Sequence, residues 1–168
     1  MKNALGVSIA LVAVLWTWLA LAGPLSDYAL VWAGFIAWGA YFTVGKDALT
    51  KTISATIFGA VMAAIAVGIV ALLDDYLAVG IAAPIAVGLT VYGLTAFDKL
   101  NNVPANVFGY AATFGFLLMG TGFNDALGME GANLIALDLA NPIIVTSLSF
   151  VLGSVFGLIS EKVAGMLK

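Results

Sequence analysis

Six long stretches of this 168-residue chain contain no charged residue and no histidine, and this feature limits the possible fold more than any other. The stretches cover residues 4–23, 28–45, 52–73, 76–97, 103–123 and 139–160. A helix needs about 20 mostly apolar residues to cross the hydrocarbon core of a bilayer. Strands of an outer-membrane barrel are about ten residues long and alternate in polarity, whereas these stretches are apolar on every side. The sequence therefore predicts an all-α membrane protein with six transmembrane helices.

The composition excludes several classes of function. Hydrophobic residues make up 63% of the chain and charged residues only 9%, whereas a soluble domain has roughly 25% charged residues. Cysteine, histidine and arginine are absent, which excludes disulfides, thiol nucleophiles, histidine-ligated metals and imidazole catalysis. The net charge of −3 also excludes a basic surface for nucleic acid. We therefore expect no enzymatic activity, no cofactor, no metal and no nucleic-acid partner.

The lysines give the orientation. If the N-terminus is cytoplasmic, all six lysines fall in segments on the cytoplasmic side, and the opposite side carries acidic residues alone. Segments rich in lysine and arginine stay in the cytoplasm of bacterial inner-membrane proteins. The sequence thus predicts a multi-pass protein of the bacterial inner membrane with both termini in the cytoplasm.

Two segments allow a second interpretation. Residues 4–23 follow Lys2 as a signal peptide would, but the apolar run is long and Pro24 disfavours cleavage after Gly23. We expect a membrane helix there. Residues 124–138 form the longest exterior loop and are mildly amphipathic, which predicts a short interfacial helix, with a lid or re-entrant segment as the alternative.

Two of the stretches share a pattern of aromatic and small residues. Residues 35–42 read Phe-Ile-Ala-Trp-Gly-Ala-Tyr-Phe, and residues 107–114 read Val-Phe-Gly-Tyr-Ala-Ala-Thr-Phe. Residues 58–61 match residues 152–155 more weakly, and the first and fourth stretches show no convincing match. A repeat of three helices enters the membrane from opposite sides in its two copies, as in many transporters.

The alignment predicts one transmembrane domain over residues 1–168, with inverted three-helix repeats over about 4–73 and 76–165. Chance is the alternative, because small and aromatic residues are common in membrane helices.

Candidate functional residues come from the aligned stretches, because no stretch contains the ionisable residue that usually marks an ion or proton pathway. Hydroxyl and aromatic side chains can line a path for an uncharged solute. The candidates for lining such a path are Trp38, Tyr41, Phe42, Tyr110, Thr113 and Phe114. We expect Phe42 and Phe114 to face each other as a constriction. The alternative is that all six side chains only pack helices together.

Five short motifs occur along the chain in a characteristic order. They are Trp32-Ala33-Gly34-Phe35, Ala40-Tyr41-Phe42, Val103-Pro104, Ala112-Thr113-Phe114 and the segment from Gly153 to Gly157. Together they resemble a family of small bacterial inner-membrane proteins classed as a domain of unknown function. The likeness covers roughly residues 28 to 165. It implies a compact multi-span membrane protein with no established activity, so it identifies no site residue.

These observations predict a channel or passive transporter for a small neutral or weakly polar solute. Six helices of so short a chain leave little room for a lumen, so we expect a homo-oligomer in the lipid bilayer. The alternative is a non-transporting subunit or assembly partner of a larger membrane complex. Ser149, Gly153 and Gly157 lie four residues apart, which predicts close helix packing within the chain or, alternatively, at a dimer surface.

Overall fold

The computed structural model describes residues 3–97, 100, 102–118, 134 and 136–168, and their regular secondary structure is entirely helical. The helices are α1 (Ala4–Leu21), α2 (Val31–Val44), α3 (Ala48–Leu73), α4 (Val79–Gly93), α5 (Val103–Leu118) and α7 (Pro142–Met166). The predicted all-helical fold is confirmed. Of these helices, α1, α3 and α7 are long and apolar enough to cross a membrane, and α2, α4 and α5 are shorter apolar helices.

The helices follow the six charge-free stretches but differ from them in length. α2 has 14 residues, α4 has 15 and α5 has 16, all fewer than the roughly 20 residues of a typical membrane span. α7 continues past Ser160 through Glu161 and Lys162 to Met166, so one carboxylate lies on a helix that was expected to end before it. The interfacial helix expected over residues 124–138 falls almost entirely outside the described residues.

Local sequence explains several helix ends. The side chains of Asn3 and Asn141 each accept a hydrogen bond from an amide in the first turn of α1 and α7, respectively. Pro142 begins α7 at a position where no amide donor is needed. α2 ends at Gly45, whose φ of +76° suits glycine. Asp47 follows with a φ of +59°, so the chain turns sharply before α3 begins.

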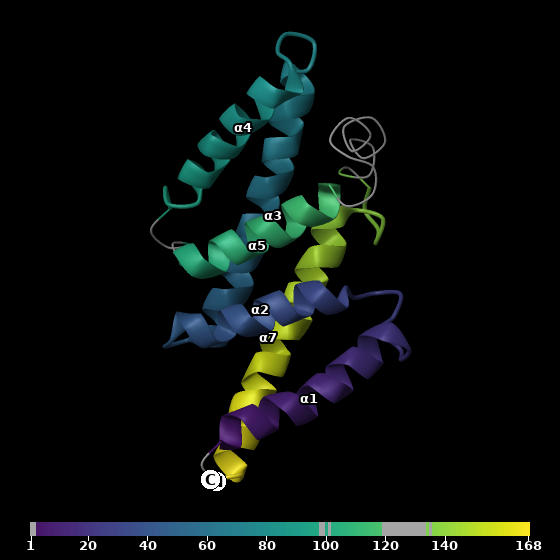
Figure 1. Cartoon of the computed structure of the whole chain (residues 1–168), viewed down its shortest axis with the longest axis vertical. Helices are drawn as coiled ribbons and strands as arrows, with labels where there is room; N and C mark the ends of the chain where they lie inside the picture. Colours follow the sequence, from purple (N-terminus) through teal and green to yellow (C-terminus); the bar gives the residue numbers. More distant parts are fainter. Residues whose placement is uncertain (1–2, 98–99, 101, 119–133, 135) are drawn as a thin grey trace.

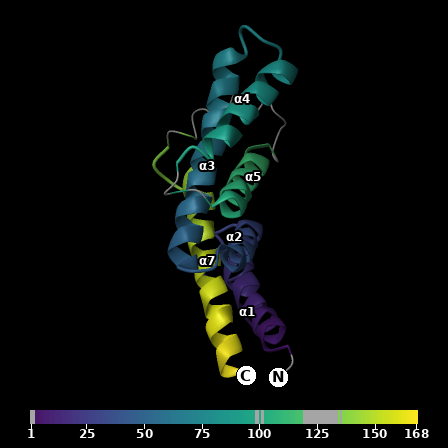
Figure 2. The same ribbon diagram turned by 90° about the vertical axis from the view of Figure 1, so that its left-hand side faces the viewer.

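The helices form two layers, seen edge-on in Figure 2. One layer holds the long helices α3 and α7, which contact each other in the middle of the molecule. In the other layer α1, α2, α5 and α4 follow one another along the long axis (Figure 1). α1 and α2 pack on α7, whereas α4 and α5 pack on α3. Both chain ends lie at the same end of the molecule, far from the turn between α3 and α4.

The buried positions of α2 recur in α5. All six buried residues of α2 have a buried counterpart in α5 at a spacing of 72 residues, from Ala33 and Ala105 to Tyr41 and Thr113. This is the spacing given by the alignment of residues 35–42 with residues 107–114. The residue types differ at several of these positions, but the two helices bury corresponding faces.

The other two helix pairs have the same property. α3 and α7 share eight buried positions at a spacing of 94 residues, for example Gly59 and Gly153. In α1 and α4 the spacing is 78 residues, and three consecutive buried positions correspond. These positions pair Ala4 with Ala82, Ser8 with Ala86, and Val12 with Thr90.

Two helix crossings bring backbones into direct contact. A Cβ atom at Gly59 of α3 would overlap the carbonyl oxygen of Asn106 in α5, and one at Gly153 of α7 would overlap the carbonyl oxygen of Gly34 in α2. Gly34 and Asn106 are separated by the 72-residue spacing, and the other two glycines by the 94-residue spacing. The two crossings therefore use corresponding positions, and both show the close approach that small residues allow between membrane helices.

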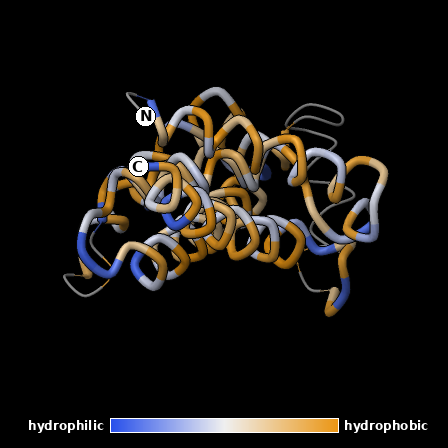
Figure 3. Tube along the Cα trace, turned by 90° about the horizontal axis from the view of Figure 1, so that it is seen from below, coloured by the Kyte–Doolittle hydropathy of each residue, from blue (hydrophilic) through white to orange (hydrophobic). Residues whose placement is uncertain are grey.

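Large apolar side chains cover the outside of the molecule. Val14 is 72% exposed, Leu72 is 77% exposed and Ile81 is 55% exposed. In Figure 3 hydrophobic colour extends along the outer sides of the helices, whereas hydrophilic colour gathers near turns and chain ends. A soluble monomer rarely exposes apolar surface on this scale. The apolar helices and their apolar outer surface together indicate a membrane protein.

Candidate functional site

Trp38 and Tyr110, the two deepest aromatic candidates, lie in separate clusters. Trp38 is buried and packs against Trp16 of α1 and Phe156 of α7. Tyr110 is buried in a cluster formed with α3 and the end of α4, and its hydroxyl oxygen lies 3.0 Å from Oγ1 of Thr90. Each ring therefore anchors an outer helix, α1 in one case and α4 in the other.

Phe42 and Phe114 do not lie opposite each other. Each is close to the C-terminal end of its helix, and α2 and α5 run in opposite directions (Figure 1). The two rings consequently lie toward opposite ends of the α2–α5 pair. Phe42 packs edge-on against Tyr41, with centroids 5.4 Å apart, and Phe114 stacks on Tyr110 at 5.7 Å. The structure thus forms two local aromatic pairs in place of the expected single constriction.

Tyr41 and Thr113 occupy corresponding buried positions but have different partners. Thr113 Oγ1 donates a hydrogen bond to Oγ1 of Thr146 in α7 at 3.2 Å. The hydroxyl of Tyr41 donates to the carboxylate of Glu161 in α7. Sequence reasoning missed Glu161 because it lies one residue beyond the last charge-free stretch. The absence of glycine, proline and asparagine from residues 158–164 was the available signal that the helix continues past Glu161.

The interior between α2, α3, α5 and α7 contains polar side chains but no charged ones among the described residues. Thr56 and Ser154 donate hydrogen bonds to carbonyl groups one turn earlier in their own helices, at 2.8 and 2.7 Å. Thr52 Oγ1 and Asn106 Oδ1 are buried and have no hydrogen-bond partner among the described residues. A buried polar atom without a protein partner often marks a place where water or a polar ligand binds.

Small side chains fill much of this interior. Four alanines pack around Phe150 of α7, and the five residues are at most 4% exposed. They are Ala33, Ala37, Ala60, Ala112 and Phe150. Methyl groups at these positions allow the helices to approach closely, so the centre of the protein is tightly packed.

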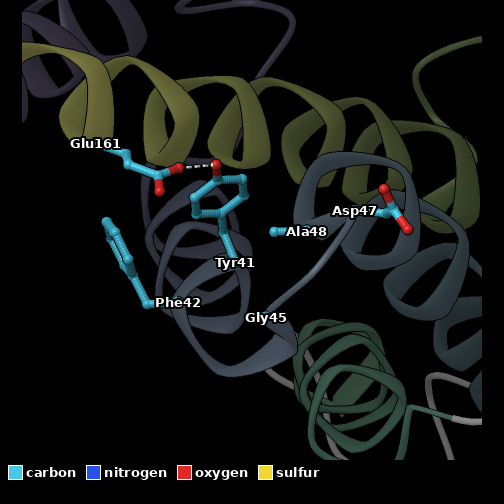
Figure 4. A pocket seen from close by; sticks show the side chains of 6 residues that line it. All are labelled: Tyr41, Phe42, Gly45, Asp47, Ala48 and Glu161. Carbon is cyan, nitrogen blue, oxygen red and sulfur yellow. Dashed lines mark hydrogen bonds between the residues drawn. The ribbon is translucent and has the colours of Figure 1, made fainter.

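A pocket of about 320 Å³ opens where α2 ends and the last turns of α7 pass it (Figure 4). We call it the end pocket, and its lining residues are Tyr41, Phe42, Gly45, Asp47, Ala48 and Glu161. The ring of Tyr41 lies against Gly157, where a Cβ atom would collide with it. Glycine at that position therefore lets the phenol reach the exposed carboxylate of Glu161. Within the described residues, no three potential metal-ligating side chains lie close enough together to hold a metal ion.

Comparison with known proteins gives a family but no activity. Neither a curated protein nor a solved structure matches this chain. The family described as "Protein of unknown function (DUF1097)" matches residues 6–165. The match extends from the first turn of α1 almost to the end of α7 and confirms the resemblance seen in the short motifs. The chain therefore belongs to the DUF1097 family of proteins of unknown function.

Proposed function

We propose that this protein is a passive channel or uniporter for a small neutral or weakly polar solute, built from two inverted three-helix repeats. The first repeat comprises α1 to α3, and the second comprises α4, α5 and α7. The observation that carries the proposal is the recurrence of buried positions at spacings of 78, 72 and 94 residues in the three helix pairs. Inverted repeats of this kind place a solute site near the membrane midplane, where the repeats meet.

The directions of the helices support the inversion. In Figure 1 the two members of each pair, α1 and α4, α2 and α5, and α3 and α7, run in opposite directions. The turn with Asp74 and Asp75 lies at the far end from both termini, as expected if lysine-rich segments face the cytoplasm of a bacterium. On this proposal all six helices cross the inner membrane, and the three shorter ones do so where the bilayer is locally thin.

The chemistry of the interior supports an uncharged solute. Threonine, serine and asparagine side chains lie between the central helices, and the free acceptors of Thr52 and Asn106 lie among them. The charged residues on the described helices are Lys51, Glu161 and Lys162, all near helix ends. An ion or proton pathway would ordinarily require a charged group at membrane depth, whereas hydroxyl and amide groups can exchange hydrogen bonds with a neutral solute.

Solute flux into proteoliposomes tests the proposal. A panel of small uncharged solutes, gases and ions is compared between vesicles with and without the protein. We expect faster entry of at least one uncharged solute. Replacing Asn106 with leucine should slow that entry, while Thr43→Val, at an exposed position whose hydroxyl bonds to its own helix, should leave it unchanged. Rates equal to those of empty vesicles across the panel would refute transport.

A second candidate function is that of a non-transporting subunit in a larger membrane complex. The closely packed centre around Phe150 favours it, because such packing leaves little room for a solute between the helices. Extraction in a mild detergent followed by native mass measurement separates the two candidates. A homo-oligomer supports the channel, whereas foreign subunits in fixed stoichiometry support the accessory role.

A further inference from the structure

We propose that the end pocket binds an alkylammonium group, either a primary amine or a methylated ammonium. The group can come from a free cation or from the headgroup of a phospholipid. This proposal concerns binding at one end of α2 and α7, and it does not depend on whether the protein transports a solute.

Two aromatic rings form a corner of the end pocket. The rings of Tyr41 and Phe42 are 5.4 Å apart and meet at 88°, so they present surfaces at right angles to each other. Phe42 is 40% exposed, and its ring is therefore accessible from outside. Aromatic faces attract cations through the ring quadrupole, and several such faces around one space are the usual receptor for quaternary ammonium groups.

The charge of the pocket suits the same ligand. Glu161 and Asp47 contribute carboxylates, and no lysine lines the pocket. Tyr41 is the one hydrogen-bonding partner of the Glu161 carboxylate within the described residues. It bonds to Oε2, so Oε1 is free to accept a hydrogen bond from an ammonium group. Figure 4 shows the carboxylate of Glu161 at the hydroxyl of Tyr41, whereas the carboxylate of Asp47 points away from this pair and adds only longer-range attraction.

The lining of the end pocket departs from the correspondence between the two halves. At the spacing of 72 residues Tyr41 corresponds to Thr113, and at the spacing of 94 residues Glu161 corresponds to Val67. The corresponding contact, between α3 and α5, has neither a phenol nor a carboxylate at these positions. Close packing of the corresponding helices therefore does not depend on a pair such as Tyr41 and Glu161, and the exposed carboxylate is available to a ligand.

Saturation-transfer NMR on the full chain in maltoside micelles tests binding of the free cation. Trimethylammonium chloride is the probe, because its N–H group can donate to the carboxylate of Glu161, and sodium chloride keeps the ionic strength constant. We expect transfer to the methyl protons of the probe. Glu161→Gln should weaken binding about tenfold or more, because it removes a charge-assisted interaction but can still accept the hydrogen bond from Tyr41. Phe42→Leu should weaken binding about 2–5-fold, because it removes one aromatic face.

A second arm distinguishes the source of the ammonium group. Native mass spectrometry compares retention of a phospholipid with an ethanolamine headgroup and one with a glycerol headgroup. Selective retention of the ethanolamine lipid, lost in Glu161→Gln, assigns the pocket to a lipid headgroup, whereas probe binding without lipid selectivity assigns it to a free cation. Asp74→Asn, in the turn at the opposite end of the molecule, serves as the control and should change neither readout.

Two results would overturn the proposal. One is the absence of both probe transfer and lipid selectivity in the wild-type protein. The other is binding that Glu161→Gln leaves unchanged, because the carboxylate would then have no part in recognition.

Discussion

Glycine is required at positions 59 and 153 because the backbones of two crossing helices are in contact at each of them. Each lies against a carbonyl group of a crossing helix, and a backbone atom cannot move aside as the tip of a side chain can. The sequence shows that small residues recur four apart, but many glycines of this chain meet nothing at all. A Cβ atom added at Gly39, Gly68 or Gly88 would have no neighbour within 4 Å, so only the structure distinguishes the required glycines from the permissive ones.

Alanine at either crossing should destabilise the protein. Gly59→Ala and Gly153→Ala should each lower the free energy of unfolding by about 1–3 kcal/mol, because the helices must separate to admit a methyl group. Gly39→Ala, with open space around it, is the matched control. Unfolding by sodium dodecyl sulfate in mixed micelles measures the difference. Wild-type stability in both crossing variants would show that the contacts are looser than described.

Trp16 should be the most costly aromatic residue to remove from α1. Its ring occupies the space beside Gly34, it is fully buried, and its Nε1 donates to the carbonyl of Val31 at 3.1 Å. Trp16→Ala should lower the free energy of unfolding by about 3–5 kcal/mol. Trp18→Ala, at a position that is 56% exposed, should cost far less in the same assay, and equal losses would contradict this role.

Charge-free stretches predict that a helix exists but not where it ends. The stretch limits what can lie in hydrocarbon, whereas the ends depend on capping side chains and on turns such as that at Gly45. For this reason α2, α4 and α5 are shorter than expected, and α7 is longer. The correspondence of α1 with α4 escaped sequence alignment because only the spacing of buried positions recurs. At that spacing the indole of Trp16 corresponds to the aliphatic side chain of Leu94.

The same limit applies to the candidate site. The alignment selected residues that the two halves have in common, and those are packing positions: Trp38, Tyr41, Tyr110 and Thr113 are all buried among helices. A site whose residues have no similar counterpart does not stand out in such an alignment. The alignment therefore did not select Glu161, whose counterpart at the spacing of 94 residues is Val67.

Paired cysteines can test the correspondence of helices, because the chain has no cysteine of its own. Thr113→Cys with Thr146→Cys should form a disulfide on oxidation, since the two hydroxyl oxygens are 3.2 Å apart. If the halves are equivalent, cysteines at Tyr41 and Thr52 should also cross-link, because they occupy the corresponding positions. A shift in electrophoretic mobility reports each bond.

The control for this test pairs cysteines at Tyr41 and Thr146. Tyr41 lies against Gly157, and Thr146 is 11 positions earlier in the same helix, or about 16 Å along its axis. This pair should not cross-link. Cross-linking at the first pair without the second would argue against equivalent halves while leaving the described contacts of α5 and α7 intact.

The predicted orientation of the whole molecule in the membrane depends on its lysines, because the apolar surface does not distinguish one side of the membrane from the other. Single cysteines at Asp27 and Asp74 should react with a membrane-impermeant maleimide on intact bacterial cells. Cysteines at Lys51 and Lys168 should react only after the cells are opened. The reverse pattern would invert the orientation, and labelling of all four positions from outside would exclude the six-helix crossing.

The two-layer arrangement has a consequence for the surroundings of the protein. In the most apolar part of α1 only 28% of residues are buried within the molecule, and even in α7 the share is 50%. In a protein only two helices thick, most side chains cannot be buried within the molecule. Most of its side chains therefore make their packing contacts with the molecules that lie against its two broad sides. Lipid acyl chains there contribute to the stability of the fold as well as acting as its solvent.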